Sequence, residues 1–542
     1  MGDGTTNHSD RNRTAGLVLL GAVCLFAAIF QGINLYDEGF ILVGAARVAR
    51  GEVPYRDFWA MYAPAQYYTL AGLFHLFGYS ILVERIWDSL MRLGICLVVF
   101  AMSRRLYSRT ASYVSFLATL LLLARYGAFG YPTVPAMFWS LLSILLLLSS
   151  VPKDRLRGVF LSGCATGVAV LYRHDLGIYT WLSAAAALFL SLCWHWREAR
   201  LGRTEVTQRM KALLAYGAGT CLVVVPFLIC LIKAVPLSDL RADILDYPRI
   251  YSRFRSLPLP PILPRLLFLP EKSQLGPAYE WSLFYAPLVV LAISWVMLLH
   301  SLWKSQAAVE SQDRRFGWIL LTLAGSSFVA TAVVRPEFFH LLPMTIPAII
   351  LVPLLLAEGQ SKRSPAWVAG LVRVSVLVVA VLYIAGPIFL YSRGLYQSAS
   401  GKKGTSSLPR ARLLYVDHDQ EDAVRYIQRH VPEGRAIFVG NAQHRDVISN
   451  DALFYYLAER PAGTRYFQFD PGVITTAAVQ QEVVRDLERN QVNYVVLCSQ
   501  PGFAMGGADE PHFPGASLLD EYLRRKYRKV ELFGYYSIWK GE

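Results

Sequence analysis

Long apolar stretches follow one another through the first two thirds of this chain, and they limit its fold more than any other feature. A transmembrane helix needs about 17–25 mostly apolar residues. Because lipid offers the backbone no hydrogen-bond partners, such stretches cross a membrane as helices. We therefore predict an α-helical polytopic membrane protein with about eleven transmembrane helices. The stretches are residues 15–33, 83–103, 110–126, 132–149, 158–172, 176–194, 212–234, 282–303, 316–334, 338–357 and 367–391.

The amino-acid composition is typical of a protein whose outer surface faces lipid. Hydrophobic residues make up 54% of the chain and charged residues 17%, against about 25% charged residues in an ordinary soluble domain. A net charge of +14 would suggest a nucleic-acid partner for a soluble protein. Here it predicts cytoplasmic loops rich in Lys and Arg, and no nucleic-acid partner.

The basic residues give the predicted bundle an orientation. With residues 1–14 in the cytoplasm, the cytoplasmic loops hold most of the Lys and Arg and the short outer turns hold almost none, as the positive-inside rule requires. The first stretch could instead be a cleaved signal peptide, but its length favours an uncleaved helix. The apolar segment 66–77 is too short to cross, so we interpret it as an interfacial or re-entrant helix. The outer loop 235–281 is unusually basic and Pro-rich, although long loops follow the rule poorly.

The composition changes after the last apolar stretch. Residues 392–411 are polar and read as a linker that follows the transmembrane domain of residues 15–391. Residues 412–542 alternate helix and strand patterns, which predicts a soluble α/β domain on the outer side. The predicted helices and strands are, in that order, residues 420–430, 447–460, 475–490 and 517–527, and residues 436–439, 465–469, 494–498 and 535–540.

Two adjacent carboxylates, Asp37 and Glu38, follow the first apolar stretch in the outer loop 34–82. A carboxylate at the membrane surface can act as a general base towards a hydroxyl group or can hold a cation. The alternative is that Asp37 only caps the helix predicted after it.

The sequence that follows these carboxylates resembles the first outer loop of the GT-C superfamily of membrane glycosyltransferases, which use polyprenyl-phosphate sugars. Similar enzymes include protein O-mannosyltransferases, aminoarabinose transferases and lipopolysaccharide-core transferases. The resemblance is detailed over residues 15–105. The residues that carry it are Asp37, Glu38, Gly51, Pro54, Tyr55, Pro64, Phe77, Gly78 and Arg85.

The resemblance implies that Asp37 is the catalytic base, with Glu38 beside it. It also implies a polyprenyl-phosphate sugar donor, a glycan, lipid or protein acceptor, and contact with membrane lipid. The chain departs from many relatives in having Tyr62, Ala63 and Pro64 where they have Lys-Pro-Pro. An arginine elsewhere must then contact the phosphate.

Several charged side chains are candidates to bind the phosphate of the donor. Sugar transfer needs positive charge beside the departing phosphate, and the guanidinium group binds phosphate bidentately. Alternatively, the charged side chains of the outer turns only reach to the lipid head groups. The candidates for phosphate binding are Arg173, Arg335, His340 and Arg56, with Asp57, Arg85, Asp88 and Asp175 as supporting residues. Arg85 and Asp88 lie in the second apolar stretch, where an internal ion-pair ladder is the alternative to a cavity wall.

We therefore expect a glycosyltransferase for a hexose or pentose, in a bacterial inner membrane, with its site and soluble domain on the periplasmic side. No organic cofactor and no metal site are predicted, although the carboxylates could hold a divalent cation. A transporter of lipid-linked sugar and a non-catalytic anchor for the outer domain are the alternatives. The enzyme hypothesis requires Asp37, Arg173 and Arg335 to converge on one outer-facing cavity.

Overall fold

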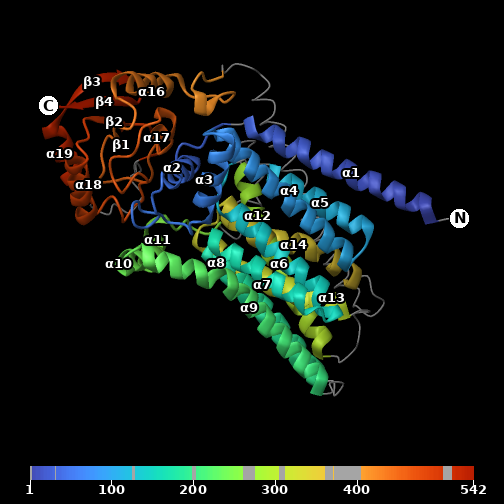
Figure 1. The fold of residues 1–542 in the computed structure, drawn as a ribbon. Coiled ribbons are helices and arrows are strands. Elements are labelled where there is room, and N and C mark those ends of the chain that lie inside the picture. Colours follow the sequence, from blue (N-terminus) through green and yellow to red (C-terminus); the bar gives the residue numbers. More distant parts are fainter. Residues whose placement is uncertain are drawn as a thin grey trace.

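The computed structural model describes residues 3–30, 32–124, 129–197, 203–260, 275–303, 312–359, 370, 405–503 and 515–542. A bundle of long helices forms one part of the molecule and a smaller α/β domain the other (Figure 1). Two short helices, α2 (Asp37–Ala49) and α3 (Ala65–Phe77), lie where the two parts meet. The ends of these helices and the loops beside them position the candidate site.

Ten helices of the bundle correspond to ten of the eleven predicted stretches. Eight of them contain apolar segments long enough to cross a membrane, while α5 and α7 are shorter apolar helices. The eleventh stretch, residues 367–391, lies outside the described residues except for Gly370. The helices are α1 (Asp3–Ala27), α4 (Ile81–Leu106), α5 (Arg109–Ala124), α6 (Thr133–Ser150), α7 (Leu156–Tyr172), α8 (His174–Arg197), α9 (Arg203–Ala234), α12 (Leu275–Trp303), α13 (Gln312–Val334) and α14 (Phe338–Gly359).

Small residues let α7 and α9 approach closely. A Cβ atom added to Gly163 would lie 2.0 Å from the carbonyl oxygen of Tyr216, and one added to Gly219 would lie 2.1 Å from that of Phe160. Membrane helices have no solvent-driven attraction, so close backbone packing of this kind is a main source of their association. Leu214, Leu222 and other apolar side chains of α9 are exposed.

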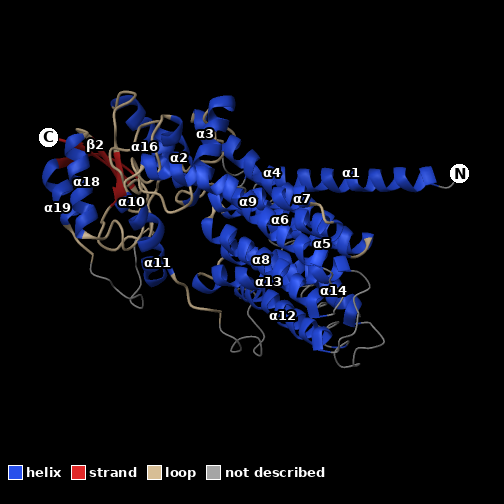
Figure 2. Cartoon of the chain, turned by 60° about the horizontal axis from the view of Figure 1, so that its bottom comes forward, coloured by secondary structure: helices blue, strands red, loops and turns tan. Residues whose placement is uncertain are grey.

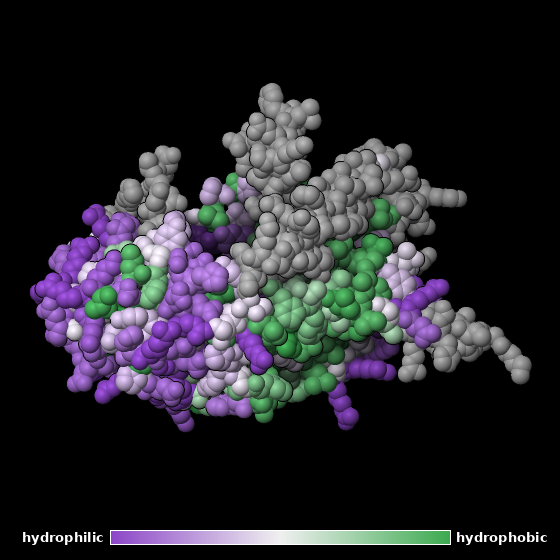
Figure 3. All heavy atoms as spheres, turned by 90° about the horizontal axis from the view of Figure 1, so that it is seen from above, coloured by the Kyte–Doolittle hydropathy of each residue, from purple (hydrophilic) through white to green (hydrophobic). Residues whose placement is uncertain are grey.

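The hydropathy of the surface differs between the helical bundle and the α/β domain. Hydrophobic residues cover the side of the bundle seen in Figure 3, whereas the α/β domain is mostly hydrophilic. An apolar band of that extent matches a lipid environment, since soluble proteins rarely expose large contiguous apolar patches. The chain is therefore a multi-pass integral membrane protein, as the sequence predicts.

The segment predicted to be interfacial is helix α3. It packs on α2, where the ring of Tyr67 lies against Gly44. Phe74 in α3 also contacts Tyr456 of the α/β domain, with ring centroids 5.9 Å apart. The helix ends at Gly78, whose φ of +83° suits a residue without a side chain. These contacts place α3 beside the α/β domain rather than among the long helices, as Figure 2 also shows.

The basic loop after α9 is mostly helical. It contains α10 (Leu237–Arg241), a π-helical turn (Ala242–Asp246) and α11 (Tyr247–Arg255). The described part of the predicted Pro-rich segment, residues 256–260, is extended. Helices α10 and α11 run beneath the α/β domain in Figure 1.

The α/β domain contains a four-stranded sheet of order β1-β2-β4-β3. Strands β1 and β2 are parallel, with Val439 opposite Val496, and the other two pairs are antiparallel. Helices and strands alternate as predicted for the first two strands. The elements are α16 (His418–His430), β1 (Phe438–Asn441), α17 (Leu453–Ala458), α18 (Ala477–Arg489), β2 (Tyr494–Cys498), α19 (Leu518–Lys526), β3 (Tyr527–Phe533) and β4 (Tyr536–Gly541).

Four local predictions for this domain need correction. Residues 465–469 form no strand, because side chains take up their backbone groups: Asn450 donates to Phe467 O and accepts from Phe469 N. The helix predicted at 447–460 shrinks to α17, and strand β3 was missed. The domain also begins before residue 412, since Ser406 bonds to Leu414 and the buried Leu408 belongs to its core.

Candidate active site

The loop before α2 places the Asp37 carboxylate at the entrance of a cavity. Asn34 orders the turn before α2, because its Oδ1 accepts hydrogen bonds from the backbone N–H groups of Tyr36 and Asp37 at 3.1 and 2.8 Å. Asn34 Nδ2 also donates to Asp37 Oδ2 at 3.0 Å. Asp37 is the first residue of α2 rather than its N-cap, which is Tyr36, and Asp37 lines the cavity.

Glu38, which was predicted to stand beside the base, lies apart from the cavity that Asp37 lines. It is fully buried and forms an ion pair with Arg85 of α4 at 2.6 Å. Arg85 also donates to the carbonyl groups of Ile29 and Gly32, and Glu38 accepts from the backbone N–H of Asn34 at 3.1 Å. Glu38 is absent from the lining of the cavity. It acts as a positioning residue that, with Arg85, holds the loop of Asp37 on the bundle.

The cavity beside Asp37 has a volume of about 460 Å³ and is shared by both parts of the molecule. Its walls include the loop before α2, the turn between α13 and α14, the end of α11, and three loops of the α/β domain. The polar and charged residues of the lining are Asn34, Tyr36, Asp37, Tyr62, Tyr131, Arg255, Arg335, Glu337, His340, Ser449, Asp470 and Gln500.

The turn between α13 and α14 brings Arg335 and His340 into this cavity, as predicted from their place in the sequence. Arg335 binds Glu337 with two hydrogen bonds of 2.6 and 2.7 Å. It also donates to the carbonyl oxygen of Arg255 at 3.3 Å, which joins the turn to α11. A guanidinium group in this bidentate arrangement offers the geometry that a phosphate group also accepts.

Arg173 lies in an adjoining cavity rather than in the same one. This second cavity has a volume of about 250 Å³, lies between α8, α11 and α13, and shares Met61, Tyr62 and His340 with the first. Arg173 pairs with Asp175 at 3.0 Å and donates to the Thr133 hydroxyl. The predicted convergence on one cavity is therefore met by Asp37 and Arg335 but not by Arg173, whose cavity adjoins theirs through shared lining residues such as His340.

Three side chains that the sequence did not single out complete the site. Asp470 of the α/β domain accepts hydrogen bonds from Tyr36 at 2.6 Å and from Arg255 at 2.9 Å. Gln468 donates to Asp470 at 3.1 Å, and Arg255 lies 5.5 Å from the Tyr36 ring centroid. The network ties α11 and the α/β domain to the residue before Asp37. Of the residues in this network, only Arg255 was marked by the sequence, because it is one of the basic residues of the outer loop 235–281, which departs from the positive-inside rule.

The surroundings of Asp37 raise its pKa towards neutral pH. Burial raises the pKa of Asp37 to about 6, while the hydrogen bond from Asn34 and the charges of Arg255 and Arg335 lower it. Burial alone lowers the pKa of Arg255, but Asp470 and Tyr36 outweigh it and raise that pKa well above the usual range. Arg255 is therefore a permanent cation and Asp37 a titratable base in the same cavity.

Two predicted side chains lie elsewhere. Arg56 and Asp57 pair with each other at 2.8 Å and line a separate cavity against α18, whose lining does not include Asp37. Asp57 accepts from the Val53 backbone and so shapes its own turn. The structure does not bring Arg56 and Asp57 to the Asp37 site, because the turn between Pro54 and Phe58 faces the α/β domain instead.

Asp88 also lies outside the cavity, as one half of an ion pair inside the bundle. It binds Arg92 at 2.6 Å, and Arg92 donates to the carbonyl oxygen of Leu123 in α5. The pair therefore orients α4 against α5, which is the alternative that the sequence left open. Within the described ranges, no group of three or more His, Cys, Asp or Glu side chains could hold a metal ion.

Comparisons with known proteins agree with this architecture. Residues 62–229 match the family of dolichyl-phosphate-mannose-protein mannosyltransferases. ArnT from Cupriavidus metallidurans, solved with undecaprenyl phosphate, is 14% identical, with 97% of this chain and 98% of that chain covered and a TM-score of 0.57. The oligosaccharyltransferase AglB from Archaeoglobus fulgidus, solved with an inhibitory peptide and a dolichol-phosphate, is 10% identical, with coverages of 90% and 70% and a TM-score of 0.52.

These likenesses establish the fold of the chain. A search of the curated proteins finds no significant match. The predicted fold class, a polytopic α-helical membrane protein with a C-terminal α/β domain, is confirmed by these likenesses, with eight described helices long and apolar enough to cross a membrane.

Proposed function

We propose that this protein is a glycosyltransferase that moves a hexose or pentose from a polyprenyl-phosphate donor to a hydroxyl group of an acceptor. The observation that carries the proposal is the meeting of Asp37 with Arg335 and Arg255 in one cavity at the end of a membrane bundle. The ligands of the two similar structures, undecaprenyl phosphate and a dolichol-phosphate, support the class of donor.

The chemistry assigns one task to each charge. The acceptor oxygen attacks the anomeric carbon of the donor sugar while Asp37 takes the proton of that hydroxyl group. The bond between the anomeric carbon and the phosphate oxygen breaks, and the phosphate leaves with the bonding electrons. Arg335 and Arg255 stabilise the negative charge that develops on the phosphate. A single displacement inverts the configuration at the anomeric carbon.

The two joined cavities suit the two substrates. The second cavity, with Tyr179, Ala330 and Val334 in its wall, lies between membrane helices and suits the start of a polyprenyl chain. Arg173 there is the further candidate for the phosphate. The first cavity is walled by Ser449 and Gln500 of the α/β domain, which suits the polar acceptor. Both residues follow the carboxyl ends of parallel strands, where open α/β sheets commonly bind ligands.

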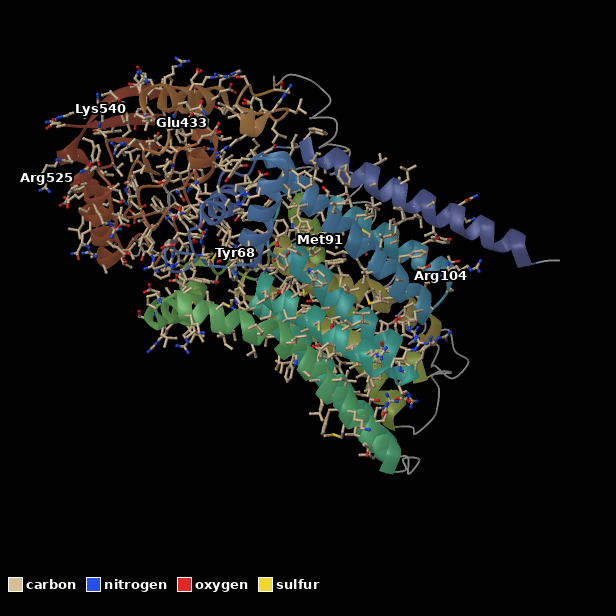
Figure 4. All side chains as sticks on the ribbon, in the orientation of Figure 1. Tyr68, Met91, Arg104, Glu433, Arg525 and Lys540 are labelled. Carbon is tan, nitrogen blue, oxygen red and sulfur yellow. The ribbon has the colours of Figure 1, made fainter. Side chains whose placement is uncertain are left out.

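Charge supports an outward orientation of this site. Arg104 lies at the end of α4 that is far from the α/β domain, as Figure 4 shows. Its neighbours in the predicted cytoplasmic loops share that side, so the positive-inside rule puts the α/β domain across the membrane. We place residues 1–14 in the cytoplasm, and the site and the α/β domain on the periplasmic side of a bacterial inner membrane.

The test of the proposal is transfer of radiolabelled sugar from a panel of polyprenyl-phosphate sugars. Membranes that contain the protein would receive each donor together with an envelope extract of the host as acceptor. Label that reaches the acceptor only when the protein is present identifies the donor sugar. Label that stays on the lipid for every donor in the panel would refute the proposal for those sugars.

The rate of transfer is expected to rise with pH and to level off above a midpoint near pH 6. Asp37 accepts a proton only when it is ionised, and its pKa is about 6 because burial disfavours the charge. The measurement is kcat/KM across the range in which Asp37 titrates. The Arg335→Gln variant removes a charge that lowers this pKa, so its midpoint should move to higher pH. A rate that falls or stays level through pH 6 would contradict the assignment.

We also propose that transfer needs no organic cofactor and no divalent metal, because Arg335 and Arg255 already supply positive charge beside Asp37. Transfer is therefore expected to persist after treatment with EDTA. The measurement compares initial rates before and after chelation. Activity that disappears with EDTA and returns with Mg²⁺ or Mn²⁺ would contradict this expectation.

A further inference from the structure

A large groove opens at the end of the α/β sheet that faces away from the candidate active site. It has a volume of about 1050 Å³, at the upper end of the range for ligand sites. Asn493 and Tyr494 at the start of β2 line it together with Lys540 at the end of β4, which lies opposite Tyr494 in the neighbouring strand. Strand β2 is five residues long, so at about 3.3 Å per residue the groove and the active-site loops are at least about 15 Å apart.

The groove is lined by cations whose charge is not balanced. Its cations are Arg435, Arg525, Lys526 and Lys540. Among the described residues, none of these four forms an ion pair with a carboxylate. The lining holds two acidic residues, Glu488 and Glu542, and Glu542 pairs with Arg528 at 2.5 Å. The four cations of the groove therefore outnumber its carboxylates.

The sequence next to the groove adds more positive charge. The run from Arg524 to Lys529 holds five cations in six residues, of which Arg525 and Lys526 line the groove and Arg528 pairs with Glu542, so Arg524 and Lys529 are the additional charges. It covers the end of α19 and the start of β3, both at the surface. Clustered cations of this kind raise the local concentration of anionic ligands and speed their association.

The position of the groove rules out the protein's own membrane as its partner. Figure 4 shows Arg525 and Lys540 at the edge of the α/β domain that lies away from the helical bundle. Helix α19 and the C-terminus keep this distant place in Figures 1 and 2. A ligand that reaches this edge must extend well beyond the bilayer surface. A long polymer that carries negative charge can bind the cations of the groove and can also extend this far from the bilayer.

We propose that this groove binds an anionic glycan, a sugar chain that carries carboxylate or phosphate groups. Arginine binds either group with a bidentate fork, and the size of the groove admits several sugar units rather than one ion. The inference rests on the proposed function in one respect: the glycan is a distal part of the acceptor, held while its reacting hydroxyl lies near Asp37. The groove itself takes no part in bond making or breaking.

Binding is tested apart from catalysis with the full-length Asp37→Asn protein in detergent, using fluorescent oligogalacturonate as the probe. We expect binding that weakens with added salt, since exposed charges are screened. The variant with Arg525→Glu and Lys526→Glu should bind at least about tenfold more weakly, which corresponds to about 1.4 kcal/mol. If that variant fails to fold, the milder pair Arg435→Gln and Lys540→Gln provides the same comparison.

The control variant is Arg412→Glu, because it reverses an exposed charge of the same domain outside the groove. It should bind the probe like the parent protein. Equal binding of an uncharged galactose oligomer, or undiminished binding by both groove variants, would overturn the proposal. Absence of binding to oligogalacturonate together with binding to anionic vesicles would also overturn it. Because the parent protein already lacks the base, none of these outcomes depends on whether the chain transfers sugar.

Discussion

The Asp37→Asn variant is expected to transfer sugar about 10²- to 10⁴-fold more slowly than the wild type, the range typical for loss of a general base. Asparagine keeps the size of the side chain and its hydrogen bond with Asn34 can be re-formed through the amide oxygen. It cannot, however, accept a proton from the acceptor hydroxyl. The measurement is the initial rate with saturating donor, so that the effect appears in kcat rather than in binding.

Asp57→Asn is the matched control for this variant. The sequence proposed Asp57 as a support for the base, but the structure places it in a separate cavity, with 31% of its side chain exposed and paired with Arg56. The same chemical change there should alter the activation free energy by about 0.5 kcal/mol or less, as for most surface substitutions. Equal rates for wild type and Asp37→Asn would remove Asp37 from the mechanism, and an equal loss in Asp57→Asn would show that the cavity assignment is wrong.

The Arg85→Met variant is expected to destabilise the folded protein by about 3–5 kcal/mol, as when one partner of a buried ion pair is removed. Both side chains of the pair are almost completely buried, at 1% exposure for Arg85 and 0% for Glu38. Removal of Arg85 leaves the Glu38 charge without its partner and frees the carbonyl groups of Ile29 and Gly32. The measurement is the midpoint of thermal unfolding in detergent.

A second substitution separates charge from packing in this prediction. Glu38→Gln combined with Arg85→Met removes the buried charge and should recover a large part of the lost stability. A double variant that is no more stable than Arg85→Met would show that the guanidinium acts through its contacts with the carbonyl groups instead. A wild-type midpoint for Arg85→Met would contradict the role of the pair altogether.

Much of the fold follows from local sequence patterns. The spans were predictable because lipid imposes a helix length, and α3 was predictable because it falls short of that length. Strand β2 at Tyr494–Cys498 was predicted with its observed bounds, since a short apolar run between turns has few alternatives. Asp37 was proposed as the base from its place after the first span and from the resemblance of the outer loop, and this role stays a prediction.

The remaining errors come from contacts between segments far apart in the chain. Arg255 and Asp470 are separated by 215 residues, and no local pattern marks their pairing. Glu38 was assigned a place in the site because it adjoins Asp37, yet successive residues of a helix face different sides. Residues 465–469 read as a strand because they are apolar and aromatic, whereas buried Asn450 takes their backbone hydrogen bonds.

The central claim is that the cavity of Asp37 transfers sugar rather than moving lipid-linked sugar across the membrane. The most direct test uses purified wild-type protein in liposomes with a labelled polyprenyl-phosphate sugar and acceptor. Our account predicts that free polyprenyl phosphate appears in a one-to-one ratio with glycosylated acceptor. Label that crosses the bilayer but stays on polyprenyl phosphate would contradict the account and would identify the chain as a transporter.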